Sequence, residues 1–268
     1  MHNKEINLED AHRFASHLAL EGGKILRDSF AETVSISVDK GSIDFSTDTD
    51  MKVDTFLQER INDKYPNTLI LSEETAPECY SEYQDADYVW INDPLDGTSN
   101  FFHGFPRFGI SIGLVKLGEP LLGVIYLPMT DELFSAQADR DGAILNGKPI
   151  HSSFIDNLKR SSFLCDWCPN EAKRQQMIGY LKGVLGEVWQ IKSQGSAVAD
   201  LCCVAAGQSE AYLNAGLKPW DVAAVSLIVK KAGGRITTPE GDKYSIFNPD
   251  IFASNTILHD PILNLINQ

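Results

Sequence analysis

Two aspartates that stand three residues apart, Asp93 and Asp96, follow a short apolar run in the first half of the chain. That run, residues 88–91, predicts a buried strand that delivers both carboxylates to its end. The backbone carbonyl of Leu95 lies between them in sequence. Two carboxylates and a carbonyl are oxygen ligands that hard divalent cations prefer. The alternative is an ordinary turn, since Asp-Pro and Asp-Gly are common turn pairs.

The residues after these aspartates favour the binding of an anion. Pro94 stiffens the turn, and Gly97 allows the backbone to come close to a ligand. Thr98 and Ser99 are suited to cap a following helical turn, whose free N–H groups would face the anion. The segment 92–101 therefore predicts cations on one side and a phosphate on the other.

Two further acidic elements lie in positions from which they can reach the same point. Glu73 and Glu74 follow a predicted strand at 69–71, and the ends of neighbouring strands meet at one sheet edge. Asp221 falls in the first turn of a predicted helix, residues 219–232. A solvated loop explains the glutamates equally simply, and a favourable helix dipole explains Asp221.

Two short polar stretches each allow a structural and a functional interpretation. Asp50 ends the stretch 48–50, which is suited to cap the predicted helix around 53–61. Gly195, Ser196 and Ala197 open another predicted helix. Exposed amides at such a helix start suit a hydroxyl-rich or anionic ligand, while capping alone explains the same residue types.

Composition excludes several classes of function. The 268 residues carry 23 Lys and Arg against 37 Asp and Glu, a net charge of −14. This charge argues against a nucleic-acid partner. No apolar run approaches the roughly 20 residues of a membrane span, and the N-terminus lacks a signal-peptide core. Five cysteines are typical of reduced thiols, so we expect a cytoplasmic protein with no membrane partner. Cys165 and Cys168 are expected to be ordinary cysteines, not a zinc or redox pair.

Periodicity predicts a mixed α and β chain. Helices are expected over 8–30, 53–61, 171–185, 196–206 and 219–232, and strands over 34–38, 69–71, 88–91, 110–114, 121–127, 133–136, 188–192 and 210–213. The pattern changes near residue 150 from strands to alternating helices and strands. This predicts an N-terminal sub-domain, 1–150, with most acidic candidates, and a C-terminal one, 151–268, with Asp221 and part of a substrate pocket.

Four stretches together resemble the inositol monophosphatase family of magnesium-dependent phosphatases. They are Glu73-Glu74 after a small residue, the segment 92–101, the Trp220-Asp221-Val222-Ala223-Ala224 string and the stretch 47–50. The resemblance implies a layered αβαβα sandwich, usually a homodimer. It also implies two or three Mg²⁺ ions and a small phosphorylated polyol or sugar as substrate.

The resemblance also assigns roles at the metal centre. Glu73, Asp93 and the Leu95 carbonyl would hold one ion, and Asp93, Asp96 and Asp221 the second. Glu74 and Lys40 would stand near the outer metal shell.

Substrate contacts and the attacking water follow from the same resemblance. Asp50 and Thr98 would orient the water, with Glu73 as the third catalytic residue. The residues expected to contact substrate are Asp96, Gly97, Thr98, Gly195, Ser196, Ala197, Asn214 and Asp221.

One departure leaves the substrate open. Many family members carry an acid that binds substrate hydroxyls where this chain has Asn214, which can hydrogen-bond a hydroxyl but carries no charge. Inositol 1-phosphate is the expected substrate. The alternatives are fructose 1,6-bisphosphate, histidinol phosphate and adenosine 3′,5′-bisphosphate, or a non-catalytic regulatory protein on the same scaffold.

Overall fold

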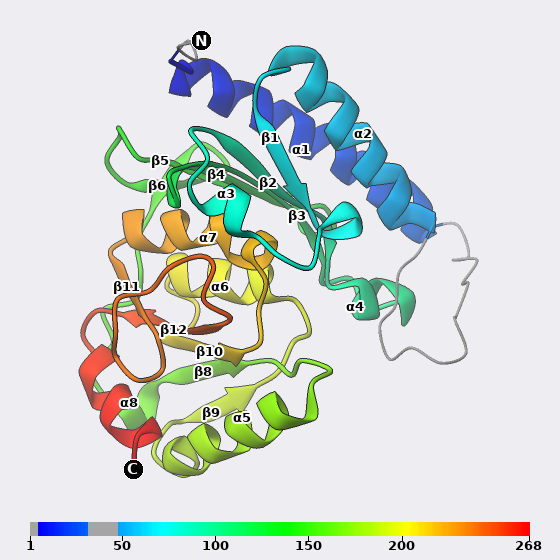
Figure 1. Cartoon of the computed structure of the whole chain (residues 1–268). Coiled ribbons are helices and arrows are strands. Elements are labelled where there is room, and N and C mark those ends of the chain that lie inside the picture. The colour runs from blue at the N-terminus through cyan, green and yellow to red at the C-terminus, as the bar shows by residue number, and fades with distance from the viewer. Residues whose placement is uncertain (1–4, 32–47) are drawn as a thin grey trace.

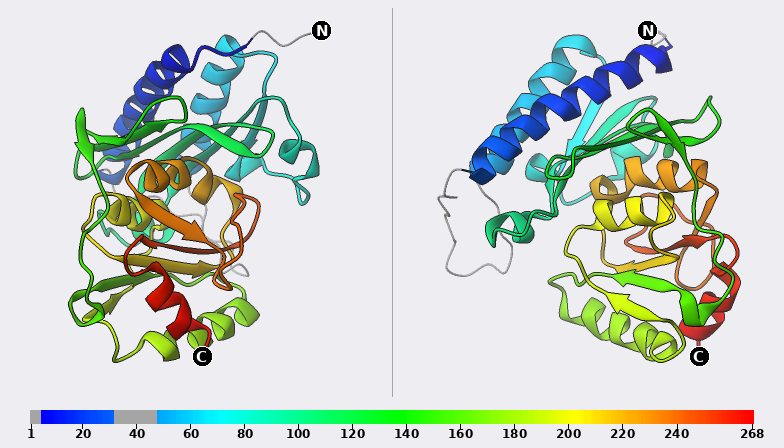
Figure 2. Two further views of the ribbon diagram at one scale, coloured as in Figure 1. Left: turned by 90° about the vertical axis from the view of Figure 1, so that its left-hand side faces the viewer. Right: turned by 180° about the vertical axis from the view of Figure 1, so that it is seen from behind.

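Helices and sheets alternate in layers through the molecule (Figure 1). The structure, a computed structural model, describes residues 5–31 and 48–268. Two long helices cover the outer face of the first sheet, two more lie between the sheets, and another pair covers the outer face of the second sheet (Figures 1 and 2). This is the αβαβα sandwich that the family resemblance predicts, and the prediction is confirmed.

Among the described residues, the first sheet has seven strands in the order β1-β2-β3-β4-β5-β6-β7. Its only parallel pair is β1 with β2, and every later neighbour is antiparallel. The strands are β1 Leu69–Ser72, β2 Val89–Asp96, β3 Gly109–Lys116, β4 Glu119–Leu127, β5 Glu132–Gln137, β6 Ala143–Leu145 and β7 Lys148–Ile150.

The second sheet has five strands in the order β11-β12-β10-β8-β9. β8 lies parallel to both of its neighbours, whereas β12 pairs antiparallel with β10 and β11. The strands are β8 Ser162–Cys165, β9 Gln190–Lys192, β10 Ala211–Ala215, β11 Gly234–Thr237 and β12 Asp250–Asn255.

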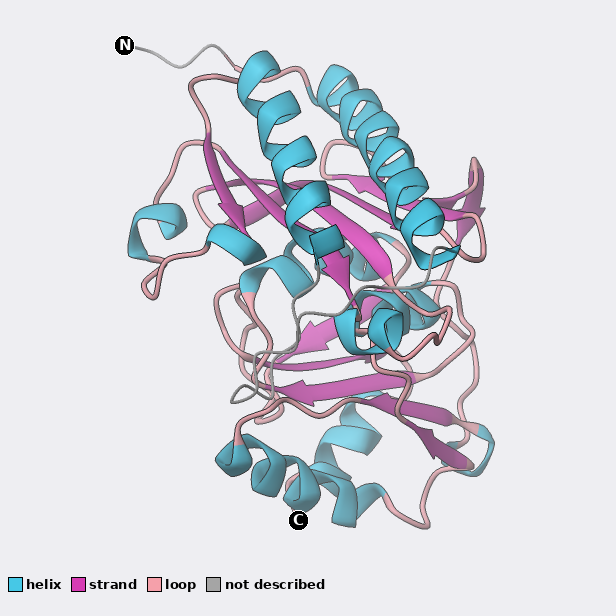
Figure 3. Cartoon of the chain, turned by 90° about the vertical axis from the view of Figure 1, so that its right-hand side faces the viewer, coloured by secondary structure: helices cyan, strands magenta, loops and turns pink. Residues whose placement is uncertain are grey.

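The helices form three layers, which Figure 3 shows from the side. The outer layer on the first sheet is α1 Leu8–Ala31 with α2 Asp48–Lys64, the layer between the sheets is α6 Ala197–Ala205 with α7 Pro219–Lys231, and the layer beyond the second sheet is α5 Glu171–Val184 with α8 His259–Ile266. Short helical segments are η1 Glu73–Thr75, α3 Ser81–Gln84, α4 Thr98–Phe102 and η2 Leu158–Arg160. In the described residues, no helix has the length and apolar character needed to cross a membrane.

Most predicted elements are present with small shifts in their ends. α1 runs through Gly22 and Gly23, where an added Cβ would lie 2.8 Å from the Ile110 side chain and 2.3 Å from the Tyr126 ring respectively. These glycines therefore let the helix approach the sheet closely. The strand predicted at 34–38 lies outside the described residues.

Three strands and one helix of the C-terminal half are the main elements that periodicity did not predict. β8, β11, β12 and α8 were not predicted, nor were the short β6 and β7. β8 has four residues and β12 is buried along its whole length, so neither shows the alternation that identifies a half-buried strand.

The largest core cluster joins both sheets. It includes Leu71 and Val89 from the first sheet, Leu164 and Tyr212 from the second, and most of the buried face of α7. The last strand of the first sheet ends at Ile150, near the expected boundary, but α7 belongs in sequence to the second half and packs on the first sheet. The two-sub-domain division stays a prediction.

Close packing of α7 on the first sheet depends on two glycines of that sheet. A Cβ at Gly123 would lie 2.2 Å from the carbonyl oxygen of Ala224, and one at Gly113 would lie 3.2 Å from the Ala224 nitrogen. Because both neighbours are backbone atoms, they cannot move aside as a flexible side chain does. These two contacts set how closely α7 approaches the sheet, and therefore where Asp221 lies.

We therefore expect Gly123→Ala to destabilise the fold by about 1–3 kcal/mol, as overpacking of a core does. Gly179→Ala is the matched control, because Gly179 lies in α5 with nothing within 4 Å of an added Cβ. Helix propensity predicts that this change is neutral or stabilises by up to about 1 kcal/mol. Urea unfolding of both variants measures the difference, and equal stabilities would contradict the packing argument.

Candidate active site

The parallel pair β1–β2 brings the first two acidic elements together. Ser72 and Asn92 are partners in the register, so the next residue of each strand, Glu73 and Asp93, comes out at the same edge. The Glu73 carboxyl lies in hydrogen-bond contact with that of Asp93. The expectation that the two loops lie side by side is confirmed.

The segment with the two aspartates is the irregular end of β2 rather than a separate loop. The pairing of β2 with β3 shifts between Asp93 and Asp96, which is a bulge that redirects the backbone. Asp93 is held because its Oδ1 accepts a hydrogen bond from the Leu95 nitrogen at 2.9 Å.

The helix cap after this bulge differs from the prediction. The residue that caps α4 is Gly97, with φ +88°, and α4 begins at Thr98, so Thr98 and Ser99 lie inside the helix. A left-handed φ strains residues with a side chain, and a Cβ at Gly97 would also lie 3.1 Å from the Arg107 carbonyl. Glycine therefore suits this point better than any other residue.

Asp221 arrives from α7 and is placed by contacts on both sides of it. Ser111, the register partner of Asp93 on β3, donates its hydroxyl hydrogen bond to the Trp220 carbonyl at 3.1 Å. Asp221 Oδ2 accepts from the Lys218 nitrogen at 2.7 Å, which is the helix-capping role that the sequence allowed. Capping fixes the carboxylate without consuming its other oxygen.

The three aspartates form a compact group. One carboxylate oxygen from each of Asp93, Asp96 and Asp221 lies within 4.8 Å of the others. Within residues 5–31 and 48–268, this is the only group of three or more His, Cys, Asp or Glu side chains close enough to share an ion. Glu73 extends the group through its contact with Asp93.

Burial and mutual repulsion make these carboxyls unusually basic. Burial, together with the charge of Asp221, raises the pKa of Asp96 to about 7, and burial raises that of Asp221 to about 6. Burial also raises the pKa values of Glu73 and Asp93 well above the ordinary range, and the neighbouring acids add to the rise. If all four carboxyls are ionised together, they need compensating positive charge.

Thr98 connects the group to α2. Its hydroxyl lies 3.2 Å from Asp50 Oδ1 and 3.0 Å from the Leu95 carbonyl oxygen. The Thr98 hydroxyl has one proton, so the Asp50 carboxylate and the Leu95 carbonyl are alternative acceptors for it, and the carbonyl oxygen also has a second lone pair for a further partner. Asp50 is buried in the first turn of α2.

The start of α6 contacts the same group from the other side. The Ser196 hydroxyl donates to Asp96 Oδ2, which also accepts from the Val198 nitrogen at 3.3 Å. Ser196 caps α6 as well, because its Oγ accepts from the Ala199 nitrogen. Gly195, with φ +77°, makes the turn into the helix. The capping and functional interpretations of 195–197 are therefore compatible.

Asp166, which the motif search did not single out, organises this turn. Its Oδ1 accepts hydrogen bonds from Ser193 Oγ at 3.1 Å, from the Gln194 nitrogen at 3.2 Å and from the Gly195 nitrogen at 2.8 Å. The signal that could have found it is an acid directly after a strand, the same pattern as Ser72-Glu73. Sequence periodicity does not reveal this acid, because β8 has only four residues, all of them buried.

Behind Asp166 lies a buried ion pair. The Arg107 guanidinium is 3.0 Å from Asp200 Oδ1, and Asp200 is fully buried. Burial and the neighbouring Asp166 raise the pKa of Asp200 to about 8, an effect that Arg107 only partly opposes. Burial raises the pKa of Asp166 as well, and the hydrogen bonds from Gly195 and Ser193 oppose that rise.

A cavity of about 420 Å³ opens over the acidic group. Glu73, Asp96 and Asp221 lie at one part of its wall, and Asn214 and Trp167 at others. Ser196, Ala197 and Gly195 also line it. Glu74 does not line it but follows Glu73 in η1, and Lys40 lies outside the described residues.

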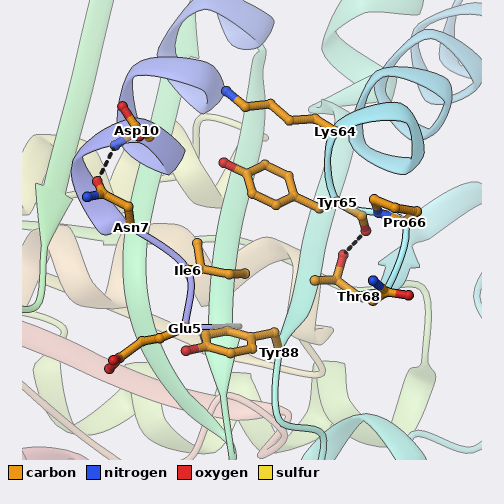
Figure 4. Close-up of a pocket in the computed structure, with 10 residues that line it drawn as sticks. Glu5, Ile6, Asn7, Asp10, Lys64, Tyr65, Pro66, Thr68 and Tyr88 are labelled. Atoms are coloured by element: carbon orange, nitrogen blue, oxygen red, sulfur yellow. Dashed lines mark hydrogen bonds between the residues drawn. The ribbon is translucent and has the colours of Figure 1, made fainter. Parts of the chain in front are cut away.

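A second cavity, of about 390 Å³, lies where α1 begins and α2 ends (Figure 4). Its walls include the rings of Tyr65 and Tyr88 and the side chains of Ile6, Asp10 and Lys64. Lys64 Nζ lies 4.4 Å from the centre of the Phe14 ring, so its charge already interacts with the face of that ring. This cavity holds no group of acids comparable to the one above.

Buried carboxylates at a shared strand edge of a two-sheet sandwich form a group that could bind a metal ion, and comparison with known proteins gives the family. The profile of the inositol monophosphatase family matches residues 7–268. The chain belongs to this family of phosphatases.

Relatives agree over almost the full length. Inositol monophosphatase 3 of Solanum lycopersicum is 34% identical over 257 residues, 95% of each chain. The fructose-1,6-bisphosphatase/inositol-1-monophosphatase of Aquifex aeolicus is 35% identical over 265 residues, 98% of this chain and 97% of that one. The crystal structure of the extragenic suppressor protein suhB from Bartonella henselae superposes with a TM-score of 0.87 at 30% identity. The superposition covers 97% of this chain and 99% of that one.

The raised pKa values predict how stability depends on pH when no cation is bound. A carboxyl whose folded pKa is raised stabilises the fold below its unfolded pKa, near 4, and that stability is lost as pH rises through the folded pKa. With Asp221 near 6 and Asp96 near 7, the loss is complete by pH 8. Chelator-treated protein should therefore melt at a lower temperature at pH 8 than at pH 5.

Addition of MgCl₂ at pH 8 should raise the melting temperature by roughly 5 °C or more, since 1 kcal/mol corresponds to about 2–4 °C in a chain of this size. Asp96→Asn should shrink both the pH effect and the MgCl₂ effect. Asp141→Asn, in an exposed turn, is the control and should change neither. A melting temperature in chelator that is the same at both pH values would refute the electrostatic account.

Proposed function

We propose that this protein is a Mg²⁺-dependent phosphate monoester hydrolase whose principal substrate is inositol 1-phosphate. The observation that carries the proposal is the meeting of Asp93, Asp96 and Asp221 within 4.8 Å, beside Glu73 and at the wall of a cavity. These acids come from three separate segments of the chain. Membership of a phosphatase family supports the reaction class.

The donor set fits Mg²⁺. All candidate ligands are oxygens, mostly carboxylate, with no His or Cys among them, and this favours Mg²⁺ over Zn²⁺. Glu73, Asp93 and the Leu95 carbonyl would hold one ion, and Asp93, Asp96 and Asp221 another, with Asp93 shared. Bound Mg²⁺ supplies positive charge to the phosphate oxygens and makes a coordinated water more acidic. A third ion, with Glu74 and Lys40 near it, belongs to the same proposal.

The attacking water is oriented by Thr98 and Asp50. When the Thr98 hydroxyl donates to Asp50 Oδ1, at 3.2 Å, rather than to the Leu95 carbonyl, its lone pairs face outward. Such a hydroxyl can accept a hydrogen bond from a water molecule, and this orients the water oxygen toward phosphorus. Asp50 is buried in α2, so the helix fixes the position of its carboxylate.

The phosphoryl group would lie against the start of α4. The amides are those of Gly97, the residue that caps α4, and of Thr98, its first residue, and amides in this position stabilise negative charge as it develops. Gly195, Ser196 and Ala197 line the cavity on the far side and would contact the alcohol part of the ester. Asp96 and Asp221 would contact the oxygens near the scissile bond, and Asn214 a hydroxyl.

Fructose 1,6-bisphosphate is the second candidate substrate. The observation that favours it is the Aquifex relative, whose name carries both activities and which is 35% identical to this chain over 98% of its length. A site that acts on a polyol ester and a sugar ester needs general hydroxyl recognition rather than a fit to one ring.

Two further parts of the proposal concern the setting of the enzyme. All five cysteines are free thiols, which supports a reducing compartment, and we propose the cytoplasm. We also propose a homodimer and the functional division into 1–150 and 151–268. The family resemblance motivates the dimer.

Asp93→Asn tests the metal centre. If Asp93 is shared between two ions, loss of its charge should lower kcat/KM by several powers of ten, because one ligand serves both sites. The exposed Asp141→Asn is again the matched control and should keep full activity. Phosphate release with MgCl₂ and then with chelator measures both, and normal turnover by Asp93→Asn would refute the shared ligand.

A substrate panel tests the specificity. We expect inositol 1-phosphate to give the highest kcat/KM, with fructose 1,6-bisphosphate second and histidinol phosphate and adenosine 3′,5′-bisphosphate lower. Faster turnover of histidinol phosphate would overturn the proposed substrate while leaving the reaction class intact. Absence of Mg²⁺-dependent phosphate release from every ester would overturn the catalytic proposal itself.

A further inference from the structure

Asn214 and Asp166 lie side by side on neighbouring parallel strands. β8 and β10 pair with Cys165 opposite Leu213, and the residue after each of these is Asp166 and Asn214. Tyr212 precedes Asn214 by two positions on β10 and so shares its face of the sheet. All three residues are buried.

Hydrogen bonds connect the three side chains in one direction. Asn214 Nδ2 donates to the Tyr212 hydroxyl at 2.9 Å, and that hydroxyl lies 3.5 Å from Asp166 Oδ2. The second contact is long for an O–H donor, so it is weak. It still decides the direction, because the hydroxyl has one proton and an amide NH₂ group cannot accept it.

The other oxygen of Asp166 shows why this residue acts as an acceptor. Asp166 Oδ1 takes three hydrogen bonds, two of them from the backbone at Gln194 and Gly195. A carboxyl group that already accepts three hydrogen bonds on one oxygen is suited to accept from the Tyr212 hydroxyl on the other. The order of donation is therefore Asn214 to Tyr212 to Asp166.

This order leaves one acceptor without a partner. Asn214 is 2% exposed, and its Oδ1 has no hydrogen-bond partner among the described residues. Asn214 also lines the cavity that contains Asp96 and Asp221. A buried acceptor left unpaired is unfavourable, so a ligand that brings a donor to this point binds more tightly.

We propose that Asp166 and Tyr212 are positioning residues that hold the Asn214 amide with its oxygen toward the alcohol part of the substrate. The site then selects phosphate esters whose alcohol carries a hydroxyl able to donate at this point. The inference rests on the proposed phosphatase function. It goes beyond that function because an unconstrained asparagine can present either its oxygen or its NH₂ group, whereas this one is fixed as an acceptor.

The test compares two esters of one ring, inositol 1-phosphate and cyclohexyl phosphate, which lacks the hydroxyls. We expect wild type to prefer the hydroxylated ester, and Tyr212→Phe to lower the ratio of their kcat/KM values about tenfold, the effect of one hydrogen bond. The change should appear mainly in KM for inositol 1-phosphate. Tyr126→Phe is the control and should keep the wild-type ratio, because the hydroxyl of this buried tyrosine bonds Asp131 and Arg27, which do not line the cavity.

Rescue separates orientation from a general structural effect. Both oxygens of a carboxylate are acceptors, so Asn214→Asp combined with Tyr212→Phe should restore the ratio without any orienting partner. If Tyr212→Phe does not fold, Asp166→Asn gives the same readout, because a neutral amide at 166 allows the Tyr212 hydroxyl to turn toward Asn214.

The outcomes are distinct from those of the proposed function. Failure of wild type to hydrolyse either ester with MgCl₂ would overturn the phosphatase proposal and this inference with it. Hydrolysis of both esters with a ratio that Tyr212→Phe leaves unchanged, or a double variant that does not recover the ratio, would overturn this inference alone.

Discussion

The repulsion among buried carboxylates is the constraint on which this structure depends. Glu73, Asp93, Asp96 and Asp221 are drawn together although burial and proximity both penalise their charges. A fold tolerates such a group only if the surrounding backbone leaves it no other arrangement. Here that backbone is supplied by strands and a helix whose positions are fixed by packing elsewhere in the molecule.

The two sheets use the same device to assemble the site. In the first sheet, parallel β1 and β2 end together and present Glu73 beside Asp93. In the second, parallel β8 and β10 present Asp166 beside Asn214. The layer of α6 and α7 lies between the sheets, and α7 adds Asp221 to the acids at the end of the first sheet. The polar groups Asp166 and Asn214 come from the second sheet. The cavity with its polar walls is the place where these two edges face each other.

Local patterns in the sequence predict the positions of some residues of this site and not of others. The pairing of Glu73 with Asp93 follows from two apolar runs that each end in acids, because parallel neighbours finish at one edge. The position of Asp221 does not follow from local patterns, since it depends on how deeply α7 packs against Gly113 and Gly123 more than ninety residues away. Only the family resemblance placed it in advance. Asp166 was missed because a four-residue buried strand has no periodicity to recognise.

The most direct test of the central claim is a crystal structure of the protein grown with MnCl₂ and measured for anomalous scattering, which locates the ions independently of activity. We predict anomalous peaks in coordination contact with carboxylate oxygens of Asp93, Asp96 and Asp221, and one that also contacts Glu73. Saturating Mn²⁺ with no peak at these four side chains, or with peaks only elsewhere on the molecule, would contradict the account.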